Sequence, residues 1–74
     1  MITLDQATKM FQKMVAEHNK PYKIEKVWEI MFDDPIYAVI VVDENGTQFF
    51  PGEVFPSIRK RDGAIIDFTF PATG

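Results

Sequence analysis

The sequence contains no cysteine and only one histidine among its 74 residues. Without cysteine, a disulfide framework and a thiolate metal site are both excluded. A single histidine also excludes a zinc site built from several histidines. We therefore expect no metal and no other cofactor, and the domain must be held together by packing alone.

Clustered basic charge and long apolar runs are missing as well. The net charge is −3, which argues against binding to nucleic acids or to anionic membrane surfaces. No apolar run approaches the roughly 20 residues that span a bilayer. The N-terminus also lacks the basic start and apolar stretch of a signal peptide. We expect a cytoplasmic protein that binds neither nucleic acid nor membranes.

What the chain does have is apolar side chains. Its length suits one domain over residues 1–74, and a domain this small buries only about 60–65% of its unfolded surface. Hydrophobic residues make up 46% of the chain, including seven phenylalanines, which is more than one small monomer needs for a core. Oligomerisation is the other support available to such a scaffold.

Residues 3–20 are predicted to form an amphipathic helix with both ends marked. Thr3 and Gln6 fit a capping box, and Asp5 suits the positive end of the helix dipole. Asn19 can adopt a left-handed closing conformation, and Pro21 stops the helix. The apolar stripe at helical spacing consists of Leu4, Ala7, Phe11, Met14, Val15 and His18.

Between residues 22 and 50 the period changes to two, which predicts strands. In residues 22–32, one face is predicted to carry Tyr22, Ile24, Trp28, Ile30 and Phe32, and the other Lys23, Glu25, Val27 and Glu29. Residues 36–42 are almost entirely apolar, as in a central strand covered on both faces. Asn45-Gly46 is a strong hairpin signal, so residues 47–50 should return antiparallel.

The last third of the chain is predicted to hold two more strands. Pro51 and Pro56 bracket a loop or sheet edge at residues 52–55, because proline cannot donate to a ladder. Residues 57–60 form a short strand, Gly63 a tight turn, and residues 64–70 a final strand. The fold class is therefore α+β, with an N-terminal helix on one face of a 4–5-stranded antiparallel sheet in meander order.

No constellation of catalytic residues is visible. His18 would need a partner such as Ser57 or Asp62, which the sequence does not place, and the last helical turn is an ordinary position for it. The carboxylate pairs at residues 33–34 and 43–44 lie in predicted turns and lack the continuation of a calcium loop. We predict that the protein is not an enzyme.

The aromatic surplus and the strand at residues 36–42 direct attention to a binding surface. One helix covers one sheet face, yet this strand carries Tyr37, Val39 and Val41 on one side and Ile36, Ala38, Ile40 and Val42 on the other. The face without a helix must be covered by residues 52–55, by a second copy of the chain, or by another protein.

Phe55 is predicted to be exposed between its prolines, and Arg59-Lys60-Arg61 is either a basic contact patch or a solvated hairpin. The candidate partner-binding residues are Tyr37, Phe49, Phe50, Phe55, Arg59 and Arg61.

Two motifs carry a resemblance to a known family. Leu4-Asp5-Gln6-Ala7 opens the helix, and residues 56–65 read Pro-Ser-Ile-Arg-Lys-Arg-Asp-Gly-Ala-Ile. In these features the chain resembles the small bacterial YrhB-like proteins and the immunity proteins related to them. It departs from their pattern at residues 49–55, where the family usually has a longer polar loop. The resemblance implies a bacterial or phage-borne protein that acts by binding another protein.

Two functional hypotheses follow from the sequence. The first is a non-enzymatic protein-binding domain, either an immunity or inhibitor protein or a domain that pairs with itself. The alternative is a small-molecule-binding or catalytic domain with an apolar pocket between helix and sheet, lined by Phe11, Trp28 and Phe68.

Overall fold

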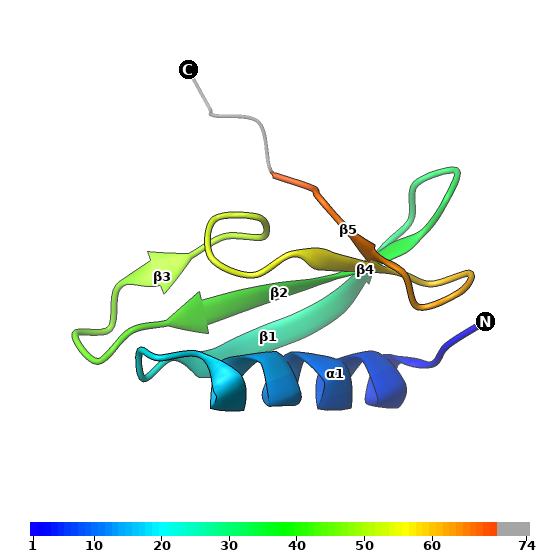
Figure 1. The fold of residues 1–74 in the computed structure, drawn as a ribbon. Helices are drawn as coiled ribbons and strands as arrows, with labels where there is room; N and C mark the ends of the chain where they lie inside the picture. Colours follow the sequence, from blue (N-terminus) through cyan, green and yellow to red (C-terminus); the bar gives the residue numbers. More distant parts are fainter. Residues whose placement is uncertain (70–74) are drawn as a thin grey trace, which may run out of the picture.

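A computed structural model describes residues 1–69, and in it one helix packs on a five-stranded antiparallel sheet (Figure 1). The elements are α1 (Leu4–Glu17), β1 (Lys23–Ile30), β2 (Ile36–Val42), β3 (Gln48–Phe49), β4 (Ser57–Arg59) and β5 (Ile65–Ile66). The predicted α+β class is confirmed. The strand order is β1-β2-β4-β5, with β3 also paired to β2, so the sheet is not a simple meander. After β3 the chain leaves the sheet at Pro51 and rejoins β2 at its other end.

The start of α1 follows the prediction, and its end does not. The amide of Gln6 donates to the Thr3 hydroxyl at 3.2 Å, and the Thr3 amide donates to the Gln6 side chain at 2.8 Å, which is a complete capping box. The predicted left-handed closure at Asn19 is wrong, because no non-glycine residue among those described has a positive φ. His18 closes the helix instead, in an extended conformation, and its Nδ1 accepts from the Lys20 amide at 3.1 Å.

A β-bulge in β1 decides which side chains face the helix. Ile24 pairs with Val41 and Lys26 pairs with Ile40, so Glu25 is one residue too many on its strand. The alternation therefore shifts by one residue at this point. Ile24 and Val27 both face α1, whereas Trp28, paired with Ala38, faces away. The predicted common face for Ile24 and Trp28 is wrong for this reason.

The core lies between α1 and the sheet. Ala7 and Phe11 of the helix are fully buried against the inward side chains of the strands. Those inward side chains are Tyr37, Val39, Val41 and Ile58. The Tyr37 hydroxyl donates to the carbonyl of Ile2 at 3.1 Å, so this buried polar group is satisfied and ties the N-terminus to β2.

The loop at residues 50–56 closes one end of the core. Gly52 has a φ of +87°, and its amide donates to the carbonyl of Phe55 at 3.1 Å. This turn directs Phe55 inward, where it is only 6% exposed, so the predicted exposure of Phe55 is wrong. Residues 68–69 run against the loop so closely that a Cβ on Gly52 would lie 2.0 Å from the carbonyl oxygen of Phe68.

This contact predicts a clear difference between two glycines. Gly46 has a similar φ of +80°, but a Cβ there would meet nothing within 4 Å. Gly46→Ala should therefore lower the free energy of unfolding by about 1 kcal/mol, which is the cost of placing a residue with a Cβ in the left-handed region. Gly52→Ala adds a backbone collision and should cost about 3 kcal/mol or more. Urea denaturation of the two variants measures the difference, and equal losses would contradict the close packing of residues 68–69 on this loop.

Candidate functional site

Helix α1 covers only part of its face of the sheet. It packs against β1 and β2, and Figure 1 shows it along the β1 side, with β4 and β5 on the opposite side of β2. Strands lie about 4.8 Å apart and a helix is about 10 Å wide, so one helix covers about two strands. Since α1 is the only helix within residues 1–69, β4 and β5 have no helix over them.

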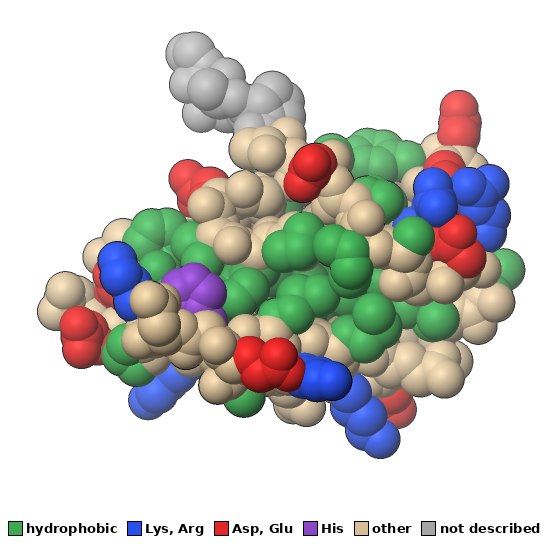
Figure 2. Space-filling model, viewed as in Figure 1, with side chains coloured by type: hydrophobic (Ala, Val, Ile, Leu, Met, Phe, Trp, Pro, Cys, Tyr) green, Lys and Arg blue, Asp and Glu red, His purple; other side chains and the backbone are tan. Residues whose placement is uncertain are grey.

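Apolar side chains gather where the helix stops covering the sheet. We call this surface the helix-side patch, formed by Ile2, Met10, Met14, Val54 and Ile65. The first four are partly buried and pack against the core, and Ile65 is 52% exposed on the same side as its buried pairing partner Ile58. Figure 2 shows hydrophobic side chains across the centre of this face, above the helix. The patch is therefore an accessible continuation of the core.

The reverse side of the sheet is also apolar, so the prediction of two apolar faces is confirmed. The register places on it Trp28, Ile30, Ile36, Ala38, Ile40, Val42 and Ile66. Ile36 and Ala38 are nevertheless buried, although residues 1–69 provide no second layer of secondary structure on this face. The rings of Phe32 and Phe68 contact each other at 5.4 Å between centroids. Ser57 is completely buried on the same side, where no substrate can reach its hydroxyl as a nucleophile.

Two of the predicted partner-binding residues cannot contact a partner in this fold. Tyr37 is 2% exposed because it lies on the helix face of β2. Phe55 is buried because the Gly52 turn places its ring edge-on against His18 and Tyr22. Phe49 is half-buried beside the Tyr22 ring, and Phe50 remains exposed. The predicted role of Phe49 and Phe50 in contacting a partner protein stays a prediction.

The predicted basic patch is largely neutralised by internal ion pairs. The pairs are Arg59 with Asp62 at 2.9 Å, Lys60 with Glu29 at 3.0 Å, and Arg61 with Asp34 at 3.6 Å. Arg59 binds Asp62 through two nitrogens, which leaves little of its guanidinium for another carboxylate. Arg61 is the more exposed of the two arginines and its pair is looser. Each cation thus has its own carboxylate, which favours the solvated-hairpin interpretation.

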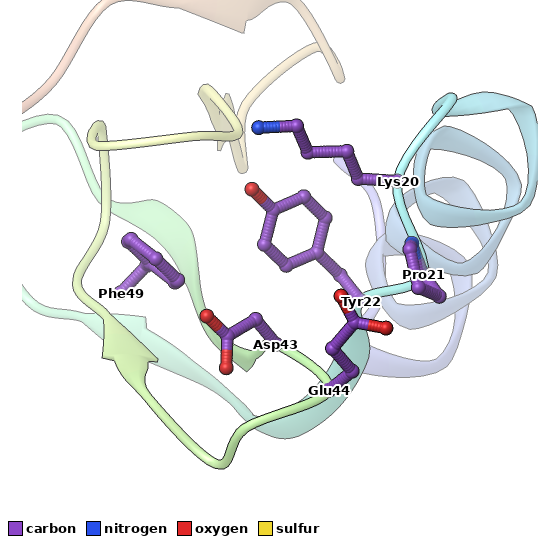
Figure 3. Close-up of a pocket in the computed structure, with 6 residues that line it drawn as sticks. All are labelled: Lys20, Pro21, Tyr22, Asp43, Glu44 and Phe49. Carbon is purple, nitrogen blue, oxygen red and sulfur yellow. The ribbon is translucent and has the colours of Figure 1, made fainter.

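A small pocket opens beside the aromatic cluster at the end of α1. It has a volume of about 250 Å³ and is lined by Lys20, Pro21, Tyr22, Asp43, Glu44 and Phe49 (Figure 3). The Asp43 carboxylate already accepts from the amides of Asn45 and Thr47 at 2.8 and 2.9 Å, as turn chemistry requires. The Oδ1 atom of this carboxylate therefore holds the hairpin, the ordinary role of aspartate in a turn.

The three side chains predicted to line a pocket between helix and sheet are not brought together there. Phe11 packs on the helix face of β2, whereas Trp28 projects from the opposite face of the sheet, as its pairing with Ala38 shows. Phe68 meets Phe32. The bulge at Glu25 separates side chains that a regular strand would have kept on one face.

Metal binding and membrane crossing can be judged for the described part of the chain. Residues 1–69 contain no group of three His, Cys, Asp or Glu side chains placed to hold a metal ion. Their single helix is not long and apolar enough to cross a membrane. Comparison with protein-family models, with curated proteins and with solved structures gave no match. The resemblance to YrhB-like proteins therefore stays a prediction.

The bidentate pair in the hairpin predicts a pH-dependent stability. The hydrogen bond from Arg59 lowers the pKa of Asp62 from 3.8 to about 2, and the Ala64 amide adds to the effect. Because the folded state favours the carboxylate, its stabilisation is present above about pH 4 and is lost as the pH falls towards 2. The Asp62→Asn variant should therefore be less stable than the wild type at pH 7, and the difference should shrink between pH 4 and pH 2.

Chemical denaturation at several pH values measures this difference. Arg59→Gln removes the largest cause of the lowered pKa and should reduce the pH-dependent difference, with the smaller effect of the Ala64 amide left in place. The double variant should behave like Asp62→Asn alone. A stability difference that stays constant down to pH 2 would show that it does not arise from the ionised Asp62 carboxylate.

Proposed function

We propose that the protein is a non-enzymatic protein-binding domain whose contact surface is the helix-side patch. The observation that carries the proposal is the mismatch between one helix and a wider sheet, which leaves Ile65 half exposed on the helix side and Met10 and Met14 only partly buried. A contiguous apolar surface of this kind is typical of protein interaction sites. Its rim is polar, with Lys13, Glu17 and Glu53 exposed around it.

The chemistry of the remaining groups supports binding rather than catalysis. The single histidine accepts a backbone hydrogen bond and packs edge-on against two aromatic rings. The arginines of the hairpin are paired with carboxylates of the same chain. The pocket of about 250 Å³ is smaller than the roughly 300–1,000 Å³ typical of small-molecule sites. An immunity or inhibitor role is the narrower form of the proposal, and its support is the resemblance of the helix and hairpin motifs.

A photocrosslinking experiment tests the proposal. A photoreactive amino acid at Ile65 should give a discrete protein adduct in cells that express the chain natively. The same group at Gln12, which is exposed in mid-helix, should give none. Met14→Glu should lower the adduct yield from position 65 by about tenfold or more, as expected for a buried apolar contact, and Lys9→Glu should leave it unchanged.

The mass of the adduct separates a foreign partner from a second copy of the chain, which would double the mass. No adduct from position 65, or equal adducts from positions 65 and 12, would contradict binding through the helix-side patch. Thermal unfolding of each variant checks that the fold is intact.

A further inference from the structure

We infer that the helix-side patch accepts an amphipathic α-helix of a partner protein, which lies beside α1 over β4 and β5 and carries basic residues on its flanks. The inference rests on the proposed function and specifies the partner's chemistry.

The width of the uncovered surface fits one helix. Two strands at about 4.8 Å spacing present about 10 Å, which is the diameter of a helix with its side chains. The floor is formed by Ile58, which is fully buried, and by its pairing partner Ile65, which is 52% exposed. Met10 and Met14 are partly buried in the flank of α1. Methionine side chains adapt readily to an incoming apolar face, and helix-in-groove binding uses such a surface.

A second copy of this chain cannot supply that helix. Within residues 1–69 the only helix is α1, and the centre of its apolar stripe, Ala7 and Phe11, is fully buried on its own sheet. The side of α1 that faces solvent carries Asp5, Lys9 and Gln12, all of them exposed. A polar helix face does not bury favourably over Ile65. An amphipathic helix of a different protein fits this surface better.

The charge around the patch favours a basic helix. Beside it lie Lys13 and Glu17, which pair at 3.9 Å, the exposed Glu53 next to Val54 in the sequence, and the exposed Asp67 two residues after Ile65. These positions carry three carboxylates and one ammonium group. The Lys and Arg side chains at the far end of this face, seen on the right in Figure 2, belong to the hairpin and have partners of their own. Lysines flanking the apolar stripe of a partner helix would complement this rim.

Designed peptides test the inference on the full 74-residue chain. The probe is a capped 16-residue peptide with leucines at i, i+3, i+4 and i+7 spacing and lysines on both flanks. We expect saturable binding by calorimetry and NMR perturbations centred on Met10, Met14 and Ile65. A peptide with the same composition but a scrambled stripe should not bind. A glutamate-flanked version should bind about tenfold more weakly at low salt, and the difference should shrink at about 1 M salt.

Two matched variants locate the site. Ile65→Glu should weaken binding by about tenfold or more, although the added carboxylate would attract a basic peptide, because it removes an apolar contact. Gln12→Glu adds the same charge on the outer side of α1 and should leave the affinity unchanged. Equal binding of the scrambled peptide, or perturbations centred on Ile40 and Val42 of the reverse face, would overturn the inference.

The peptide and crosslinking experiments fail in distinguishable ways. If the helical probe does not bind while position 65 still gives a protein adduct, the partner is not a helix and the proposed function stands. If neither experiment gives a signal, both are overturned.

Discussion

Strand β2 is the element on which the rest of the structure depends. It pairs with β1 along one edge and with both β3 and β4 along the other, so every other element except β5 contacts it directly. Its residues from Ile36 to Val39 are all buried, and its side chains divide between the helix face and the reverse face. A central strand of this kind requires an unbroken run of β-branched and other apolar residues, because both of its faces are shielded from water.

The bulge in β1 determines what each face of β2 meets. By adding Glu25, it brings Ile24 and Val27 together under α1 and sends Trp28 to the reverse side. It also places Glu29 on the helix face, where its carboxylate binds Lys60 at 3.0 Å. A regular strand would have placed Ile24 and Trp28 on one face, as the sequence periodicity predicts. A single extra residue thus divides the apolar content of β1 between two surfaces.

Turn and capping signals within a few residues could mostly be predicted from the sequence, with the helix end at Asn19 as an exception, whereas distant contacts could not. The Thr3–Gln6 capping box and the positive φ at Gly46 and Gly63 follow from residues within a few positions of each other. The burial of Phe55 depends instead on Gly52 fitting against residues 68–69, and nothing near Phe55 in the sequence reveals that contact. The ion pair of Lys60 with Glu29 joins residues 31 apart. It could not be read from the sequence, which left a basic contact patch and a solvated hairpin as alternatives. The helix-side patch was not predicted from the sequence, because the predicted alternation places Ile65 on the side of the last strand opposite to the aromatic residues.

The uncovered surface beside α1 follows from the dimensions of the fold rather than from any one loop. A helix is as wide as about two strands, and β1, β2, β4 and β5 lie side by side. A second helix over β4 and β5 would need some 12 further residues, beyond what residues 1–69 provide. The chain closes most of the gap with Ile2, Val54 and Phe55, which reach the core from loops. Loop side chains shield the buried Ile58 but leave Ile65 open, so the exposed surface lies where a second helix would have packed.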